Sequence, residues 1–350
     1  MIQNQANPLI CDLDFNQLQD HLNQWGQEQY RARQIWSGLY KNYQLSPDEM
    51  TVLPKALREM LGSKLEFNIL RPIKRVFSTN RSTEKVLFSL HDGHAIESVL
   101  MQYRNRISLC ISTQAGCAMG CVFCATGQMG FKRNLSHGEI IAQVLYFSSQ
   151  LTKLQKKLTN IVIMGMGEPF HNYEATLAAV DRLNDPTAVG LGERRFTIST
   201  VGIIPKIKKF AEEQRQINLA VSLHAADDQL RSSLLPINKK YPLDELLEIC
   251  RYYTRITNRR ITFEWALIEN VNDMDVQAHL LSTKIKGMLC HVNLIPLNES
   301  KGYKEQATPL EKANNFKEIL QNHHIPCTIR SRKGIDIAAG CGQLMDETIK

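Results

Sequence analysis

The stretch GCAMGCVFCATG, residues 116–127, places Cys117, Cys121 and Cys124 in the spacing C-x3-C-x2-C. Three thiolates this close together can surround one soft metal centre, and thiolate is the ligand that iron–sulfur clusters use. A cluster of four irons that is held by only three thiolates keeps one iron open to a substrate. The alternative is a zinc site, which would need a fourth ligand from a distant part of the chain. Closed zinc knuckles more often show two CxxC pairs, and the sequence has no second pair, so the triplet indicates an iron–sulfur site.

The segments on both sides of the triplet alternate between strand-like and helix-like patterns. Short apolar runs typical of strands lie at residues 107–113, 160–167, 194–200, 217–225, 261–268 and 290–298. Amphipathic patterns typical of helices lie between them, at residues 137–151, 173–184, 204–214, 243–255 and 276–287. Strands that alternate with helices predict an α/β fold whose parallel sheet curls into a full or partial barrel.

Two smaller units are expected before the first of these strands. Amphipathic spacing predicts three short helices, at residues 15–26, 30–42 and 53–65. Two extended runs on either side of Gly93 predict a β-hairpin, at residues 84–92 and 94–103.

These patterns divide the chain into three parts. We expect a helical accessory domain at residues 1–70, a hairpin extension at 71–105 and the α/β core domain at 106–350. The last of these contains Cys341 in a loop near the C-terminal end.

Composition and length fit a globular enzyme. The chain has 350 residues, of which 43% are hydrophobic, and this is enough for a full core. It has no apolar run of about 18 residues and no signal pattern at its N-terminus, so we expect a cytoplasmic protein that does not insert into membranes. Cysteines in that compartment are reduced, and the nine here are expected to bind metal, react or lie in the core. The net charge of +7 suggests an anionic partner.

Polar residues and glycines follow the predicted strands at the point where each strand ends. In parallel barrels the active site lies at the carboxyl ends of the strands. The residues expected there, in strand order, are Cys117, Gly165, Gly167, Glu168, Ser199, Ser222, His224 and Asn298. The sequence therefore predicts a site at this rim of the sheet.

Motifs along most of the chain resemble a known family. The cysteine triplet with Phe123, and the run MGMGEP at residues 164–169, resemble the radical S-adenosylmethionine (radical SAM) superfamily. Further segments resemble the RlmN/Cfr family of adenine methyltransferases, from about residue 12 to the end: SLCISTQAGC, CATGQMGFKRNL, STVGIIP, SLHA, PINKKYP, FEWALIENVND, NLIPLN and DIAAGCGQL. The resemblance implies a partial (β/α)6 radical SAM barrel with a [4Fe-4S] cluster and S-adenosylmethionine, two molecules of which are used per turnover.

The resemblance also implies the reaction. Family members methylate a ring carbon of an adenine in 23S ribosomal RNA. The RlmN branch acts on C2, and some of its members also modify tRNA, whereas the Cfr branch acts on C8. Pro169 in GEPFHN resembles RlmN, while other stretches such as KVLF and QVLYF have a Cfr-like character, so we favour C2 and keep C8 as the alternative. C2 of adenine is electron-poor and does not attack a sulfonium methyl group, which explains why a methyltransferase would need radical chemistry.

Residue roles follow from the same resemblance. The cluster ligands are Cys117, Cys121 and Cys124, and the S-adenosylmethionine contacts are Gly167, Glu168, Ser199, Ser222, Leu223, His224 and Asn298. Cys341 accepts a methyl group, the adenosyl radical takes a hydrogen atom from it, and the resulting methylene radical adds to C2. Glu97 removes the C2 proton. Cys110 then attacks Cys341 and releases the product through a transient disulfide that an external electron donor reduces.

The residue patterns alone give these positions other interpretations. Cys110 lies within a strand, where a structural cysteine is the default, and Glu97 in a hairpin is more often a solvated residue. Cys341 lies between Gly340 and Gly342, which give a mobile thiol the backbone freedom it needs, although the usual family pattern has alanine at position 340. The other cysteines that match no motif are interpreted as core residues: Cys11, Cys250, Cys290 and Cys327.

Basic and aromatic residues predict RNA contacts. The segment at residues 30–44, which contains the second predicted helix, combines both kinds, as folded RNA with unstacked bases requires: Arg31, Arg33, Trp36, Tyr40, Lys41 and Tyr43. Further basic residues fall next to the predicted site: Arg104, Arg106, Lys132, Arg133, Arg330, Arg332 and Lys333. The target adenine must leave its stack to expose C2. We expect a monomer that binds 23S ribosomal RNA and tRNA. An electron carrier without a substrate and a radical enzyme that acts on a small molecule or peptide stay open as alternatives.

Overall fold

The centre of the protein is one long sheet. The computed structural model describes residues 7–300 and 302–345, so the outer ends of the predicted terminal domains, 1–6 and 346–350, lie outside the described residues. Within the described residues, the strand order of this sheet is β1-β2-β3-β4-β7-β8-β9-β10-β11-β12, and every neighbouring pair from β4 onward is parallel. The parallel strands are β4 (Ile107–Cys110), β7 (Asn160–Ile163), β8 (Phe196–Thr200), β9 (Asn218–Ser222), β10 (Ile261–Leu267), β11 (Cys290–Pro296) and β12 (Cys327–Ile329). The six predicted strands and their parallel arrangement are confirmed, and β12 is an addition.

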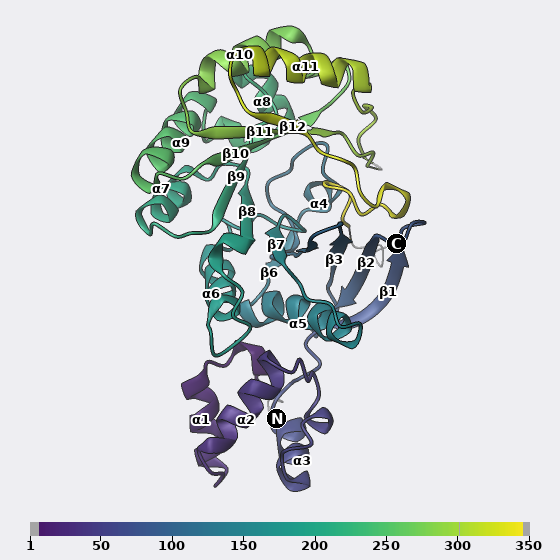
Figure 1. Ribbon diagram of the computed structural model, residues 1–350, viewed down its shortest axis with the longest axis vertical. Helices are drawn as coiled ribbons and strands as arrows, with labels where there is room; N and C mark the ends of the chain where they lie inside the picture. The colour runs from purple at the N-terminus through teal and green to yellow at the C-terminus, as the bar shows by residue number, and fades with distance from the viewer. Residues whose placement is uncertain (1–6, 301, 346–350) are drawn as a thin grey trace, which may run out of the picture.

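Helices cover the outer side of this curved sheet (Figure 1). The predicted helices are present as α5 (His137–Lys153), α6 (Tyr173–Asn184), α7 (Ile204–Glu212), α9 (Leu243–Thr257) and α10 (Asp275–Ile285). Three helices were not predicted, α4 (Ala125–Gln128), α8 (Asp228–Leu234) and α11 (Leu310–Asn322). Helix α5 begins with a capping box, in which Ser136 and Glu139 each accept the other's backbone N–H.

The predicted hairpin is part of the same sheet. Its strands β2 (Thr83–Ser89) and β3 (Ala95–Gln102) are antiparallel, and β3 also pairs with β4. The edge strand β1 (Arg71–Phe77) was not predicted, because almost all of its side chains are exposed and it shows no apolar alternation. The hairpin therefore extends the sheet on the side of β4, opposite β12.

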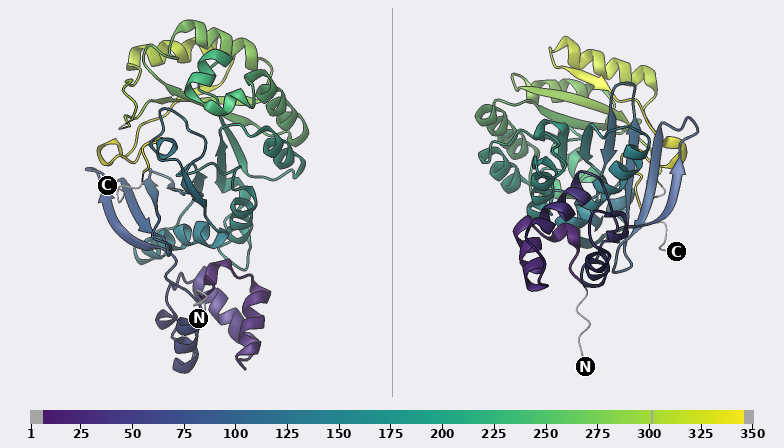
Figure 2. Two further views of the ribbon diagram at one scale, coloured as in Figure 1. Left: turned by 180° about the vertical axis from the view of Figure 1, so that it is seen from behind. Right: turned by 60° about the horizontal axis from the view of Figure 1, so that its bottom comes forward.

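The three predicted N-terminal helices form a helical module at one end of the molecule (Figures 1 and 2). They are α1 (Phe15–Gln24), α2 (Tyr30–Tyr40) and α3 (Lys55–Lys64). Arg182 of α6 joins this module to the core, since its guanidinium donates to the main-chain oxygen of Leu13 at 2.9 Å and to the hydroxyl of Tyr40 at 3.0 Å. The guanidinium also lies 4.4 Å from the centre of the Trp36 ring.

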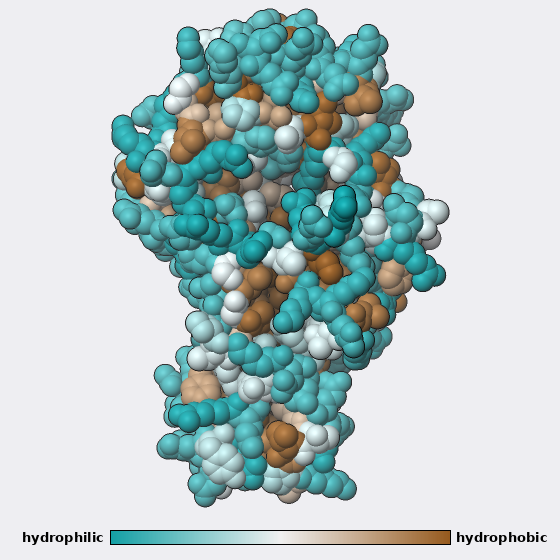
Figure 3. Space-filling view, viewed as in Figure 1, coloured by the Kyte–Doolittle hydropathy of each residue, from teal (hydrophilic) through white to brown (hydrophobic). Residues whose placement is uncertain are grey.

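The face of the molecule in Figure 3 is mainly hydrophilic, and its apolar residues are scattered or form small groups. The helical module, at the bottom of that view, follows this pattern. Among the described helices we find none with the length and apolar character that a membrane span requires.

Candidate active site

The cysteine triplet lies in a loop beside the carboxyl end of β4. A small hairpin of β5 (Gln114–Gly116) and β6 (Phe131–Asn134) holds the base of this loop. Gly116 has a φ of 72°, and a Cβ at this position would lie 1.9 Å from the main-chain oxygen of Gly130. Only glycine permits the two arms of the loop to approach this closely.

The three cysteines line one cavity, which we call the main cavity. Burial, together with the nearby charges of Glu168 and Cys124, raises the pKa of Cys117 to about 12. Burial likewise raises the pKa of Cys121 and of Cys124. Thiolates in such surroundings need a cation beside them. The donor set thus fits an iron–sulfur cluster, which binds thiolates and supplies positive charge.

Glu168 lies at the end of β7, also in the wall of the main cavity. Its carboxylate accepts the backbone N–H groups of Phe170 and Val201, each at 2.9 Å. Burial raises its pKa to about 7. The preceding residue, Gly167, has a φ of 102°, and a Cβ there would lie 2.6 Å from Gln114. The result is a buried carboxylate held by backbone donors beside the cysteines, where an ammonium group would stabilise its ionised form.

Ser199, Ser222 and His224, at the ends of β8 and β9, complete this side of the main cavity. His224 has a φ of 60° and accepts the backbone N–H of Ala266 on Nδ1 at 2.8 Å. Burial, and then the charge of Arg231, lower its pKa to about 3. The ring is therefore neutral at physiological pH, and its role is to shape the cavity rather than to carry charge.

Leu223 is buried behind the strand ends, and both of its backbone groups bind the protein itself. Its N–H donates to Glu264 O at 3.0 Å, and its main-chain oxygen accepts from Arg231 Nε at 3.2 Å. Its predicted backbone contact with S-adenosylmethionine therefore stays a prediction, and the structure gives this residue a scaffolding role.

Arg231 of α8 is a functional candidate that the sequence did not reveal. Its side chain is fully buried and donates to the main-chain oxygens of Val201 and Ser222 as well as that of Leu223. A fourth bond joins it to the Asn238 side chain at 2.7 Å. Burial lowers its pKa to about 10. One guanidinium thus ties together the ends of β8 and β9, where the main cavity is built.

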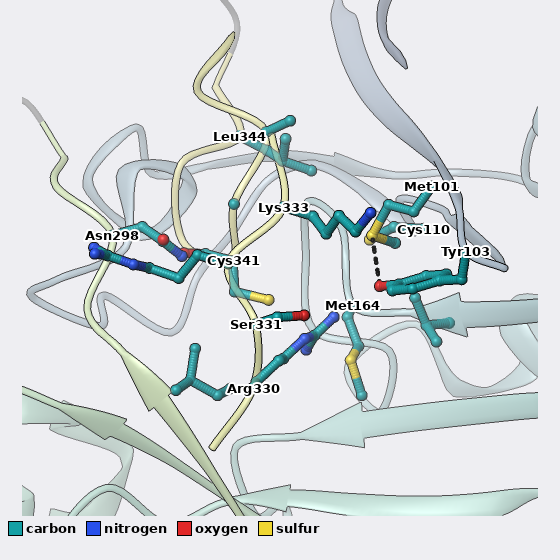
Figure 4. Close-up of a pocket in the computed structure, with 15 residues that line it drawn as sticks. Met101, Tyr103, Cys110, Met164, Asn298, Arg330, Ser331, Lys333, Cys341 and Leu344 are labelled. Atoms are coloured by element: carbon teal, nitrogen blue, oxygen red, sulfur yellow. Dashed lines mark hydrogen bonds between the residues drawn. The ribbon is translucent and has the colours of Figure 1, made fainter. Parts of the chain in front are cut away.

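Cys341 connects the main cavity to a second, smaller one, which we call the side cavity. The side cavity also contains Cys110 of β4, so the structure brings together the two cysteines predicted to exchange bonds. Figure 4 shows them on different segments around the same hollow. Cys110 is buried, and burial followed by the charge of Cys341 raises its pKa to about 12, whereas Cys341 is exposed.

Arg330 and Asn298 lie in the walls of both cavities. The charge of Cys341 is the main cause that raises the pKa of Arg330, with a smaller contribution from buried Glu264. The positive charge of Arg330 therefore lies beside the sulfur that is predicted to carry the methyl group. Asn298 donates from Nδ2 to the main-chain oxygen of Cys341 at 3.0 Å.

Glu97 is not among the described residues that line the two cavities. It is buried on β3, where its carboxylate forms an ion pair with Lys85 at 2.9 Å and accepts the backbone N–H of Met345 at 3.0 Å. This burial excludes the other interpretation of Glu97, that of a solvated surface residue. Its predicted role as a base stays a prediction, because the carboxylate is buried and each of its oxygens already binds a donor of the protein.

The structure corrects part of the predicted RNA surface. Trp36 and Tyr40 are buried against Arg182, so their rings are not available to stack on bases. Arg133 is held by Glu139, with two bonds of 2.7 and 2.8 Å, and by Asp92. The basic residues that remain exposed are Arg33, Lys41, Arg104, Arg106, Lys132 and Arg332. The four cysteines interpreted as core residues, Cys11, Cys250, Cys290 and Cys327, are all buried.

Comparison with known proteins gives matches along nearly the whole chain. The model of the radical SAM superfamily matches residues 111–282, and the model of the ribosomal RNA large subunit methyltransferase N-terminal domain matches residues 9–67. The dual-specificity RNA methyltransferase RlmN 1 of Myxococcus xanthus is 47% identical over 323 residues, which cover 92% of this chain and 90% of the relative. A probable dual-specificity RNA methyltransferase RlmN of Chloroflexus aurantiacus is 44% identical over 346 residues, with 96% and 92% covered.

One solved structure is similar throughout. It is the crystal structure of a radical SAM methyltransferase from Sphaerobacter thermophilus, which is 46% identical in sequence. The two folds agree with a TM-score of 0.94, and the match covers 96% of this chain and 99% of the other. The radical SAM fold predicted from the sequence is confirmed by this match.

Proposed function

This chain belongs to the RlmN family of radical SAM methyltransferases, and on that basis we propose that it methylates C2 of an adenine in 23S ribosomal RNA and in tRNA. It is an enzyme that modifies RNA, which excludes the alternative of an electron carrier. The choice of C2 is supported by Pro169 and by the RlmN names of these relatives.

The cofactors of the family are a [4Fe-4S] cluster and S-adenosylmethionine, which together supply a 5′-deoxyadenosyl radical and a methyl group. Cys117, Cys121 and Cys124 would hold the cluster. Glu168, with its carboxylate fixed by backbone N–H groups, would bind the ammonium group of S-adenosylmethionine. The remaining contacts are proposed for Gly167, Ser199, Ser222, Leu223, His224 and Asn298.

The observation that carries the proposal is the position of Cys341 in the walls of both cavities. From there its sulfur can accept a methyl group on the side of the main cavity and carry the carbon to C2 of the adenine. Arg330 supports this role, because it lies with Cys341 in the walls of both cavities and brings a positive charge to the place where they meet.

Release of the product is proposed for Cys110 and Cys341 together. Attack of the Cys110 sulfur on the Cys341 sulfur would form a disulfide and break the bond from Cys341 to the transferred carbon. That carbon would leave with the bonding electron pair and take up a proton, which gives the methyl group of the product, and an external electron donor would then restore both thiols. Burial keeps Cys110 protonated until that step. Glu97 would accept the C2 proton. The shared side cavity supports the pairing of the two cysteines.

RNA binding is proposed for the helical domain at residues 1–70, with the hairpin extension at 71–105 and the core at 106–350 completing the surface. Support comes from exposed Arg33 and Lys41 on the helical module, from Arg104 and Arg106 between β3 and β4, and from Arg332 in the wall of the side cavity. We further propose that the enzyme acts in the cytoplasm, where its RNA substrates are. One chain provides both reactive cysteines and both cavities, which supports a monomer.

Mass spectrometry of nucleosides tests this function. Ribosomal RNA and tRNA would be isolated from cells with and without this protein. Loss of 2-methyladenosine from 23S ribosomal RNA and from tRNA is expected in cells that lack it. Loss of 8-methyladenosine instead would show that C8 is the target, and unchanged RNA in both samples would contradict the proposal.

A further inference from the structure

A buried ion pair joins strands β2 and β3 of the hairpin extension. Lys85 of β2 and Glu97 of β3 are 2.9 Å apart, and their side chains are only 7% and 2% exposed. Lys85 pairs across the sheet with Val99, and Glu97 pairs with Leu87, so the two charged side chains are diagonal neighbours on one face. A pair of charges this well buried is costly unless its remaining donors and acceptors are also bound.

Both partners bind the segment that carries Cys341, which we call the C-terminal cysteine loop (residues 334–345). Lys85 Nζ donates to the main-chain oxygen of Ala338 at 3.1 Å. Glu97 Oε2 accepts the backbone N–H of Met345 at 3.0 Å. Ala338 precedes Cys341 by three residues and Met345 follows it by four. One ion pair therefore holds the loop on both sides of its cysteine.

The backbone of the loop needs such support. Ala338 has a φ of 49°, in the left-handed region that residues other than glycine avoid. Strained backbone of this kind persists only where neighbouring structure holds it. The hairpin extension also holds the loop at a second point, between β1 and β2. There Thr79 donates to the Asp336 carboxylate from its backbone N–H and its hydroxyl, at 2.7 and 2.8 Å.

We propose that Lys85 is a positioning residue which, through Glu97 and Ala338, holds the C-terminal cysteine loop so that Cys341 lies between the two cavities. The task of Cys341 rests on the proposed function, but the contacts that hold the loop do not. The hairpin extension thereby gains a role apart from RNA binding, since it binds the loop that carries the reactive cysteine.

Glu97 has a double role in this arrangement. One carboxylate oxygen binds Lys85 and the other binds the loop, so the residue proposed as the base also helps to hold the loop that carries Cys341. Glu97→Gln separates the two functions of the carboxylate, because the amide oxygen can still accept from Met345 but no longer balances the charge of Lys85.

Hydrogen–deuterium exchange of the full-length protein with its reconstituted cluster tests the proposal without RNA or turnover. Lys85→Met is expected to raise amide exchange in residues 334–345 about tenfold, while peptides from β7 to β11 keep their wild-type exchange. Lys85→Arg keeps the charge and is expected to restore most of the protection. Arg75→Met is the matched control, since the Arg75–Glu84 pair, at 2.7 Å, joins β1 and β2 and forms no hydrogen bond or ion pair with the described residues of the loop.

The outcomes are distinct. Unchanged exchange of the loop in Lys85→Met, or an equal rise throughout the protein, would overturn the proposal. Should Lys85→Met fail to fold, Glu97→Gln provides the same test, with a rise expected at residues 334–339 and a smaller one at Met345. Cells that contain this protein but whose RNA carries no methylated adenine would refute the proposed function and leave this exchange result intact.

Discussion

Asn298 donates a hydrogen bond from Nδ2 to the main-chain oxygen of Cys341 at 3.0 Å, while its Oδ1 is buried and has no partner among the described residues. Asn298 lies in the walls of both cavities. Nδ2 of the amide thus holds the C-terminal cysteine loop, and Oδ1 is left to accept a hydrogen bond from a ligand. A buried acceptor without a partner is costly, so a donor from S-adenosylmethionine would relieve that cost.

Asn298→Ala is expected to weaken S-adenosylmethionine binding. Loss of one hydrogen bond to the ligand, about 1 kcal/mol, corresponds to a dissociation constant about fivefold higher. Equilibrium dialysis with the cluster-reconstituted protein measures this. Asn315→Ala is the control, because this exposed asparagine binds Asp275 far from the site. Equal affinities of the wild type and Asn298→Ala would mean that Oδ1 is not a ligand contact.

Glu168→Gln is expected to change how stability depends on pH. Burial raises the pKa of Glu168 to about 7, from 4.5 in the unfolded chain. Between these values the folded protein retains a proton that the unfolded chain has released, so a rise in pH favours unfolding. This group therefore costs stability progressively as pH rises from 4.5 to 7, by at most about 3 kcal/mol in total.

Urea unfolding of the cluster-free protein at pH 5 and pH 7.5 measures that effect. Glutamine does not ionise, so the variant should gain stability relative to the wild type as pH rises. Exposed Glu311 provides the control substitution, Glu311→Gln, which should follow the wild type at both pH values. A difference between wild type and Glu168→Gln that is the same at both pH values would rule out the raised pKa.

Arg231→Met is expected to destabilise the protein by about 3 kcal/mol, because four oxygen atoms would lose their buried donor. Those oxygens belong to Val201, Ser222, Leu223 and Asn238. Arg231→Lys should recover part of the loss, since an ammonium group reaches fewer of them. Urea unfolding measures both variants, with Arg195→Met, at an exposed position, as the control. If Arg231→Met lowers the free energy of unfolding by less than about 1 kcal/mol, these hydrogen bonds contribute little to stability.

Sequence periodicity was sufficient for the six core strands, the hairpin and most helices, because each repeats an apolar pattern of strand or helix. It failed for β1, which is exposed, and for β12, which spans only Cys327–Ile329. Helix α11 does carry a signal, since Ala313, Phe316 and Leu320 are buried at helical spacing. The burial of Trp36 and Tyr40 could also have been foreseen, because they lie four positions apart on the apolar face of α2.

The candidate site was predictable where a motif fixes the residue, and not where its role arises from tertiary contacts. Lys85 lies in an ordinary strand pattern, and only the folded chain brings it to Ala338, 253 positions away. Arg231 resembles any helical arginine until its burial is known. Neither residue has a local sequence signal for its role.

Cys110→Ala is expected to trap a covalent complex between the enzyme and RNA through Cys341. The variant can still load Cys341 and join its carbon to the adenine, but it lacks the sulfur that forms the disulfide and releases the base. Denaturing gels and mass spectrometry of the crosslinked peptide detect the adduct. Cys250→Ala, at a buried cysteine that lines neither cavity among the described residues, is the control and should yield no adduct. Cys110→Ala combined with Cys341→Ala should abolish the adduct. Cys110→Ala protein that stays free of RNA, while wild type and Cys250→Ala methylate it, would contradict the roles assigned to the two cysteines of the side cavity.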